Sequence, residues 1–217
     1  MNKKAFIFDL DGVIVDTAKY HFLAWKELAE ALGFDFTEEQ NELLKGVSRV
    51  RSLDILLDLG KVELSQAEKD KYLVEKNEQY LKYISKMDTT EILPGISKLL
   101  TFLKAEKIRF ALGSASKNAR LILKNLNLLD LFDAIVDGND VSTAKPDPEV
   151  FLIAAEKLGA DPEDCIVVED ALAGIQAAKA AGMTTIAIGE PEILKGADYN
   201  LESTDELTIE LVSQLIK

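Results

Sequence analysis

Short apolar runs alternate with segments of helical periodicity along most of this chain. The apolar runs predict strands at residues 3–8, 108–113, 134–137, 165–170 and 184–189, with a short strand near 198–201. Between them, apolar residues recur every three or four positions, which predicts helices at 96–106, 117–126, 148–158, 171–181 and 205–216. Strand–helix repeats of this length predict an α/β fold with a doubly wound, mostly parallel, Rossmann-like sheet.

One long block interrupts the alternation. From residue 16 to 87 the pattern is helical, beginning with Phe22, Trp25, Leu28, Ala29 and Leu32 and continuing through 38–44, 50–59 and 65–84. The block contains no convincing strand pattern. We therefore predict an inserted all-helical cap domain at 16–87 and a catalytic core made of 1–15 and 88–217.

The first predicted strand ends in two carboxylates, Asp9 and Asp11, which share one face of an extended chain. The carboxyl end of a parallel strand is where open α/β folds bind ligands. Two anions so close repel each other unless a cation or a proton intervenes. This favours Mg²⁺, with Asp9 as a nucleophile on phosphorus and Asp11 as the group that moves the proton. The alternative is a turn whose Asp residues cap the next helix.

Two further segments follow predicted strands or precede predicted helices. In GSASKN at 113–118, Ser114, Ser116 and Lys117 can form an anion site at a helix start, although a simple serine cap is an equal alternative. In AKPDP, Pro146 places Lys145 in a loop just before a helix, where a lysine is usually solvated.

The apolar strand VVED ends in Glu169 and Asp170, which can supply further Mg²⁺ ligands from a second strand end. The alternative is that these acids only match the dipole of the following helix. For each segment taken alone, the purely structural explanation (a helix cap, a solvated lysine or acids that match a helix dipole) is reasonable. The four segments in this order favour a phosphoryl-transfer site.

The composition of the chain limits the kinds of partner that it can bind. With 25 Lys and Arg against 38 Asp and Glu, the 217-residue chain has a net charge of −13, which argues against a nucleic-acid partner. No stretch is long and apolar enough to span a bilayer, so we expect no membrane partner. Cys165 is the single cysteine and opens an apolar run, which predicts a buried structural thiol. A cytoplasmic enzyme is the prediction.

The four segments, in this order and over essentially the full chain, resemble the four loops of the haloacid dehalogenase superfamily of phosphotransferases. A helical insert directly after the first segment matches the cap of its phosphatase and phosphoglucomutase branch. Within that branch the resemblance is closest to the β-phosphoglucomutases. Three segments carry this resemblance. LKGVSRVRS at 44–52 is similar to the specificity loop of those enzymes, and SASKN at 114–118 is similar to their sugar-phosphate loop. TAKYHFLAWKELAE at 17–30 is similar to their hinge and first cap helix.

The resemblance implies roles for the core residues. Asp9 would carry an aspartyl phosphate, and Asp11 would act as general acid and base. Mg²⁺ would be bound by Asp9, the Asp11 backbone carbonyl, Glu169 and Asp170. The transferring phosphoryl group would be held by Ser114, the Ala115 amide and Lys145.

The resemblance also implies ligands around the cap. The distal phosphate would be bound by Arg49, Ser116, Lys117 and Asn118. The sugar would be contacted by Lys45 and Gly46, with Ser52 as a secondary contact, while Thr17, His21 and Lys76 would link cap position to Asp11. Without the resemblance, Lys45, Arg49 and Arg51 would be interpreted as an ordinary solvated basic stretch.

The implied activity is interconversion of β-D-glucose 1-phosphate and D-glucose 6-phosphate through an aspartyl phosphate and β-glucose 1,6-bisphosphate. The nearest alternative is a sugar phosphatase of the same superfamily, in which water intercepts the aspartyl phosphate. A receiver-like signalling module is a further alternative, but the helical insert and Asp11 argue against it. We expect a monomer, because core and cap of one chain can close an active site. The preferred sugar phosphate stays open.

Overall fold

The computed structural model describes residues 5–44 and 47–216. Within these ranges six parallel strands form one sheet in the order β3-β2-β1-β4-β5-β6. Their bounds are β1 Ala5–Phe8, β2 Phe110–Gly113, β3 Ala134–Val136, β4 Cys165–Glu169, β5 Thr184–Ile188 and β6 Tyr199–Leu201. Because β1 is central and later strands add outward on both sides, the predicted doubly wound sheet is confirmed.

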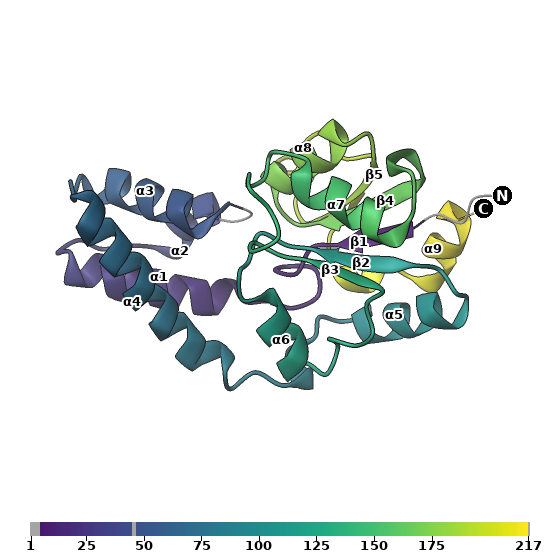
Figure 1. Ribbon diagram of the computed structural model, residues 1–217, viewed down its shortest axis with the longest axis horizontal. Helices are drawn as coiled ribbons and strands as arrows, with labels where there is room; N and C mark the ends of the chain where they lie inside the picture. Colours follow the sequence, from purple (N-terminus) through teal and green to yellow (C-terminus); the bar gives the residue numbers. More distant parts are fainter. Residues whose placement is uncertain (1–4, 45–46, 217) are drawn as a thin grey trace.

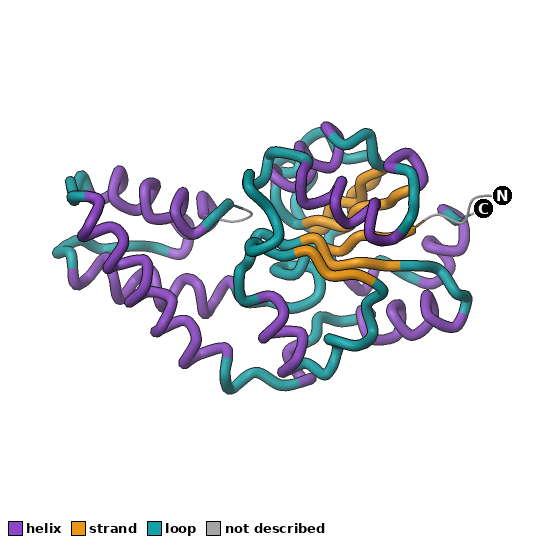
Figure 2. The backbone as a smooth tube through the Cα atoms, viewed as in Figure 1, coloured by secondary structure: helices purple, strands orange, loops and turns teal. Residues whose placement is uncertain are grey.

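Helices cover both faces of this sheet (Figures 1 and 2). Alternate side chains of β1 point to opposite faces, so Phe6 and Phe8 enter one hydrophobic cluster and Ala5 and Ile7 another. The first cluster packs under α5 (Ile96–Ala105), α6 (Ala119–Asn125) and α9 (Ile209–Leu215). The second packs under α7 (Glu149–Leu158) and α8 (Leu172–Ala180). The core of the protein is therefore a three-layer sandwich.

The last helix begins later than its apolar pattern predicted. A short 3₁₀ turn, η4 (Thr204–Glu206), comes first, and α9 begins only after Thr208. The Thr208 hydroxyl accepts the backbone N–H of Leu211 at 3.2 Å, which caps the helix and fixes its start. Two other 3₁₀ turns, η2 (Thr89–Glu91) and η3 (Pro162–Asp164), lie in connections.

Between the first strand and α5, the described residues form helices joined by loops, with isolated β-bridges only at Asp11, Val15 and Ile92. Besides η2, these helices are α1 (Ala18–Ala31), α2 (Glu38–Asn41), η1 (Glu42–Leu44), α3 (Arg49–Gly60) and α4 (Gln66–Ile84). Figure 1 shows these helices as a group beside the sheet. They enclose a hydrophobic cluster of their own, built on Trp25, Leu28, Ala29, Phe36, Leu44, Leu53, Leu56 and Leu57. The boundaries of a separate cap domain at 16–87 stay a prediction, which this cluster supports.

The strands point their carboxyl ends at the helical group (Figure 1). The loops that follow β1, β2 and β4, three neighbouring strands, carry Asp9, Ser114 and Asp170 to this edge. Open α/β folds bind ligands at such an edge, where the strand order reverses. Among the helices in the described ranges, none has the length and apolar character needed to cross a membrane.

Candidate active site

Three carboxylates meet where β1 and β4 end. The backbone N–H of Asp9 donates to the Val168 carbonyl at 3.0 Å, which extends the sheet pairing by one residue and fixes Asp9 beside β4. Oxygens of Asp9, Glu169 and Asp170 all lie within 4.8 Å of one another. Glu169 is fully buried, and its Oε2 accepts the backbone N–H of Ala171 at 2.8 Å.

Lys145 joins this cluster from the loop before α7. Its Nζ lies 2.6 Å from Asp9 Oδ1 and 2.6 Å from Glu169 Oε1, and it donates to the Gly113 carbonyl at 3.0 Å. The residue is only 4% exposed, so the interpretation as a solvated loop lysine is wrong. Burial lowers the pKa of Lys145, but the charges of Asp9 and Glu169 outweigh it and hold the pKa above its ordinary value. The ammonium is therefore charged in the site.

Asp11 lies beside the cluster on the turn after β1. The Asp11 backbone N–H donates to Asp9 Oδ2 at 3.0 Å, and its carboxylate accepts the hydroxyl of Thr17. Thr17 is the N-cap of α1 but makes no side-chain cap bond, because its hydroxyl serves Asp11 instead. Burial, with the charge of Asp9 beside it, raises the pKa of Asp11 to about 7. Both protonation states of this carboxyl are accessible near neutral pH.

The cluster suits a divalent cation bound through oxygen. Lys145 pairs with Asp9 and Glu169, so three carboxylates carry more negative charge than this ammonium neutralises. Burial raises the pKa of Glu169 to about 6, which reflects the cost of its charge in this environment. A bound cation would lower that cost, and carboxylate oxygens are the ligands that Mg²⁺ prefers.

A glycine makes room for one of these ligands. Gly12 has φ +74°, and a Cβ added there would overlap the Asp170 carboxylate. The side chain of Asp170 can therefore lie against the β1 turn and face Asp9 only because residue 12 has no side chain.

The serine loop after β2 is held by its own hydroxyls. Ser114 is buried, and its Oγ accepts the backbone N–H of Ser116 at 3.1 Å. The Oγ of Ser116 accepts the N–H of Asn118 at 3.3 Å, and the Asn118 side chain donates to Asn77 of α4 at 2.9 Å. The two serines therefore order the loop itself, while Asn118 connects it to the helical group.

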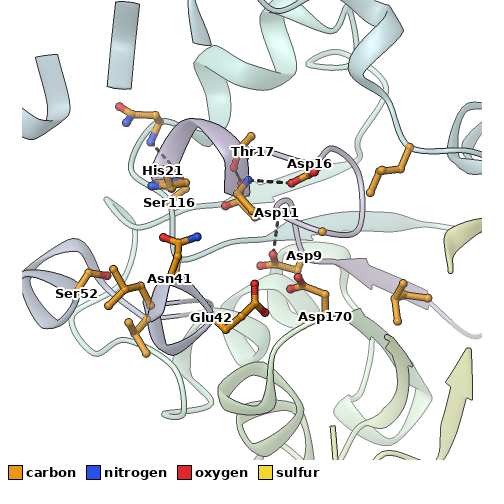
Figure 3. A pocket seen from close by; sticks show the side chains of 18 of the residues that line it. Asp9, Asp11, Asp16, Thr17, His21, Asn41, Glu42, Ser52, Ser116 and Asp170 are labelled. Carbon is orange, nitrogen blue, oxygen red and sulfur yellow. Dashed lines mark hydrogen bonds between the residues drawn. The ribbon is translucent and has the colours of Figure 1, made fainter. Parts of the chain in front are cut away.

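A cavity of about 550 Å³ lies between the sheet edge and the helices (Figure 3). Its core wall includes Asp9, Asp11, Asp170 and the loop from Ala115 to Asn118. Its helical wall includes His21, Trp25, Asn41, Arg49, Ser52 and Lys76. A cavity of this volume is typical of binding sites for small-molecule ligands.

Two basic side chains, Lys76 and Arg49, enter the cavity from the helical wall. Lys76 is 2% exposed, and its Nζ lies 2.9 Å from His21 Nδ1 and 4.4 Å from the centre of the Trp25 ring. Burial, and then the charge of Arg49, hold the pKa of Lys76 well below its ordinary value. Arg49, the first residue of α3, has no acidic partner among the described residues. Arg49 is thus available to an anionic ligand.

The structure brings most of the predicted site residues together. Thr17, His21, Arg49, Ser52, Lys76, Ala115, Ser116, Lys117 and Asn118 line the large cavity with Asp9, Asp11 and Asp170. Ser114 and Lys145 line a smaller adjoining cavity of about 230 Å³, which Arg49 and Lys117 share. Lys45 and Gly46 lie outside the described residues.

Several other positions carry polar or aromatic groups near the site, although no sequence pattern points to them. They include Trp25, which belongs to the apolar helical pattern of 22–32, and the polar residues Asn41, Glu42 and Asn77. Asp16, Ser203, Thr204 and Asp205 also line the cavity. Trp25 is indeed buried in the helical cluster, but it also forms part of the cavity wall. The polar run EEQNE around Asn41 gave no signal, because nothing in it distinguishes a pocket-facing amide from a solvated one.

Comparisons with known proteins agree with this geometry. The haloacid dehalogenase-like hydrolase family matches residues 3–182. The chain is 47% identical to β-phosphoglucomutase of Bacillus subtilis, over 97% of this chain and 94% of that protein. It is 33% identical to a phosphorylated carbohydrates phosphatase of Thermotoga maritima, over 84% and 83%. A crystal structure of β-phosphoglucomutase from Clostridium difficile matches with a TM-score of 0.94 and 43% identity, over 99% and 97%. The chain therefore belongs to the haloacid dehalogenase-like hydrolases.

Proposed function

We propose that this enzyme is a Mg²⁺-dependent phosphomutase that interconverts β-D-glucose 1-phosphate and D-glucose 6-phosphate. The observation that carries the proposal is the placement of Asp9 and Asp11 on a cavity whose opposite wall supplies Arg49 and Lys76. A bisphosphate needs positive charge at both ends, and this cavity offers it from core and helices alike. The 47% identity to a β-phosphoglucomutase supports the same substrate pair.

The reaction consists of two transfers through Asp9. Phosphorylated Asp9 gives its phosphoryl group to the 6-hydroxyl of β-glucose 1-phosphate, while Asp11 takes the hydroxyl proton. The resulting 1,6-bisphosphate turns over in the cavity. Asp9 then attacks the phosphorus at C1, Asp11 returns the proton to the leaving oxygen, and glucose 6-phosphate departs.

The core residues hold the transferring group. Lys145 already lies against Asp9, so its ammonium can neutralise an equatorial phosphoryl oxygen, together with Ser114 and the Ala115 amide. The residues that would hold Mg²⁺ are Asp9, the Asp11 backbone carbonyl, Glu169 and Asp170. When bound, the ion neutralises phosphoryl charge and orients the group for in-line transfer.

The helical wall binds the other end of the substrate. We assign the distal phosphate to Arg49 of the helical wall together with Ser116, Lys117 and Asn118 of the core wall, and the sugar to Ser52. Lys45 and Gly46, which lie outside the described residues, are assigned to the sugar by the resemblance. The Ser52 hydroxyl donates to the Ser48 carbonyl at 3.2 Å, so it is left to act as an acceptor. Thr17, His21 and Lys76 connect the helices to Asp11. Ligand contacts to both walls favour closure, which excludes water from phosphorylated Asp9.

The test is ³¹P NMR of the protein with Mg²⁺, β-glucose 1-phosphate and a trace of glucose 1,6-bisphosphate. We expect glucose 6-phosphate with little inorganic phosphate. Rapid release of inorganic phosphate instead would identify a sugar phosphatase, the activity of the Thermotoga maritima relative.

The nucleophile is tested in the same assay. Asp9→Asn removes the attacking carboxylate, so turnover should fall to background. Asp130→Asn is a matched control. Asp130 is exposed and lies in the loop before the start of β3, whereas the site lies where the strands end. Appreciable turnover by Asp9→Asn would contradict the assignment.

A cytoplasmic location and a monomeric state stay predictions.

A further inference from the structure

The loop that follows β3, residues 137–140, lies against the serine loop. β3 pairs with β2, the strand that the serine loop follows, so the two loops leave the same edge of the sheet side by side. Residues 115–118 of the serine loop line the large cavity, whereas the described residues 137–140 do not. Any effect of the β3 loop on a ligand in that cavity is therefore exerted through the serine loop.

Two donors of the β3 loop bind backbone carbonyls of the serine loop. The N–H of Gly138 donates to the Ser116 carbonyl at 3.3 Å, and Asn139 Nδ2 donates to the Lys117 carbonyl at 3.0 Å. The same Nδ2 donates to Asp137 Oδ1 at 2.9 Å. Both of these neighbours are acceptors, so the nitrogen of the Asn139 amide, and not its oxygen, must face them.

The β3 loop is itself firmly held. Asp137 is fully buried, and its Oδ1 also accepts the backbone N–H of Asn139 at 2.8 Å. Its Oδ2 lies 3.0 Å from Arg120 Nε, and Arg120 Nη2 donates to Asp140 Oδ2 at 2.9 Å. The backbone N–H of Asp137 donates to the same oxygen of Asp140 at 2.9 Å. Asn139 therefore presents its donor from a fixed position.

Gly138 allows the two loops to approach closely. A Cβ added there would lie 2.4 Å from the Ala115 carbonyl oxygen and 3.0 Å from Lys117 Cγ. The first of these contacts is with backbone, so a side chain at position 138 would push the serine loop away. The three residues share a wall of the smaller cavity.

These contacts determine which way the peptide groups of the serine loop point. In a trans peptide, the carbonyl and the N–H of the next residue point in opposite directions. Because Gly138 holds the Ser116 carbonyl, the N–H of Lys117 points away from the β3 loop. Because Asn139 holds the Lys117 carbonyl, that oxygen points toward the β3 loop. A carbonyl oxygen turned toward a phosphate would repel it, whereas an N–H donates to it.

We propose that Asn139 is a positioning residue that holds the serine loop in its phosphate-binding conformation. This inference rests on the proposed function, which assigns the distal phosphate of the sugar bisphosphate to the serine loop. Asn139 does not touch the phosphate. Its loss frees the Lys117 peptide to turn, which lowers ligand affinity although every group that binds the ligand is still present.

The first test compares Asn139→Ala with Asn200→Ala, both made in Asp9→Asn so that no phosphoryl group is transferred. Both asparagines are exposed and both substitutions leave the charge unchanged, but Asn200 lies on β6, at the other edge of the sheet. In calorimetry, the Kd for β-glucose 1,6-bisphosphate should rise about fivefold in Asn139→Ala, the usual effect of one lost hydrogen bond, and stay unchanged in Asn200→Ala. The thermal midpoint of Asn139→Ala should fall by no more than about 4 °C. An unchanged Kd in Asn139→Ala would overturn the proposal.

A second measurement separates the position of the serine loop from general stability. The backbone amide of Lys117 is followed by ¹H–¹⁵N NMR in the same proteins. In the Asp9→Asn parent its proton should shift downfield when the bisphosphate binds, because the N–H gains a charged acceptor. At saturating ligand the shift should be smaller in Asn139→Ala and full in Asn200→Ala. A full shift in Asn139→Ala would show that the loop binds phosphate without this support.

Inorganic phosphate with Mg²⁺ is titrated into the same proteins as a second probe. If the enzyme were a sugar phosphatase, the products of the wild type in ³¹P NMR would show it, and the phosphoryl group would still bind at the serine loop. The Kd for inorganic phosphate should then also rise about fivefold in Asn139→Ala. Equal Kd values in Asn139→Ala and its parent would contradict the role of Asn139 whichever product forms. Failure of the mutase proposal and failure of this inference are therefore distinguishable.

Discussion

At the scale of single residues, His21 has an unusual environment. It is the only histidine of the chain, its Nδ1 lies 2.9 Å from Lys76 Nζ, and its ring stacks on Tyr80 with centroids 4.1 Å apart. Burial, followed by the charges of Lys76 and Arg49, holds the pKa of His21 well below its ordinary value of 6.5. The imidazole is therefore neutral in the folded protein.

This neutrality predicts a specific pH dependence. The unfolded chain protonates His21 below pH 6.5, whereas the folded protein does not. The unfolded state then binds more protons, so the free energy of unfolding falls as the pH falls, by up to about 1.4 kcal/mol per pH unit. Above pH 6.5 the effect is absent. Denaturant unfolding of wild type and His21→Gln between pH 7.5 and 5.5 measures it as a growing difference between the two proteins.

The comparison with His21→Gln is necessary because other groups titrate in the same range. The raised pKa values of Asp11 and Glu169 give a slope of the opposite sign, which is common to both proteins. NMR provides a direct check, since the single histidine ring should show no titration down to pH 5.5. A midpoint near pH 6.5 would contradict the prediction.

Gly12 is the second residue whose role is specific enough to test. In Gly12→Ala the new methyl group must displace the Asp170 carboxylate. We expect the affinity for Mg²⁺ to fall about 10- to 100-fold, as for loss of other groups that orient metal ligands. Calorimetric titration with Mg²⁺ measures the effect.

Gly182→Ala is a matched control for backbone strain. Gly182 has φ +75°, nearly the value of Gly12, but a Cβ added there meets nothing within 4 Å. Both variants should therefore lose about 1–2 kcal/mol of stability from the positive φ, and only Gly12→Ala should lose metal affinity. Equal Mg²⁺ affinities for the two variants would refute the argument.

At the scale of elements, α4 connects the helical group to the site. It carries Lys76, which contacts His21, and Asn77, whose side-chain oxygen accepts a hydrogen bond from Asn118 in the serine loop. Its start is fixed by a capping box in which Ser65 Oγ accepts the N–H of Glu68 and the Glu68 carboxylate accepts the N–H of Ser65 at 2.8 Å.

Loss of this capping box should weaken α4 measurably. Ser65→Ala removes the acceptor for an N–H of the first turn, which costs about 1 kcal/mol in the free energy of unfolding. Ser85→Ala is the control at the other end of α4, where the hydroxyl donates to the Lys82 carbonyl on the exposed surface, and it should cost less than about 0.5 kcal/mol. Urea unfolding compares the two. Equal losses would show that the capping box does not stabilise the helix.

At the scale of the whole molecule, the site exists only because the helical group and the sheet edge enclose one cavity. Arg49 and Arg51 lie two positions apart on α3, yet Arg49 lines the cavity and Arg51 is exposed. Under the proposed function, Arg49 binds the phosphate that is not being transferred.

Arg49→Ala should therefore weaken binding of β-glucose 1,6-bisphosphate about 10- to 100-fold, the usual cost of a lost hydrogen bond to a charged group. Phosphorylation of Asp9 by a small donor should be unaffected, because that reaction needs only the core wall. Calorimetry and ³¹P NMR measure the two quantities, with Arg51→Ala as control. Unchanged binding of the bisphosphate by Arg49→Ala would show that the distal phosphate lies elsewhere.

Periodicity in the sequence was sufficient to predict the strands and most of the helices. Each of these elements has a local signal, such as the apolar run of β1 or the helical stripe of α1, and burial in the sheet follows from that pattern. The last helix was predicted to begin at residue 205, but α9 begins at Ile209, because Thr208 caps the helix there. Glu169 and Lys145 were identified as candidates by short motifs that belong to strand ends and loops.

The sequence alone thus determined the α/β fold, the helical insert and the chemical groups of the site, because these depend on short-range pattern and residue type. Only the tertiary structure decided which groups meet. Lys145 is buried because parallel pairing brings β1 beside β4, far along the chain, and closes Asp9 and Glu169 around it. Asn41 lines the cavity because Phe36 and Leu44, on either side of α2, are buried in one cluster with residues of α1 and α3. Such contacts depend on long-range packing, which leaves no local pattern in the sequence.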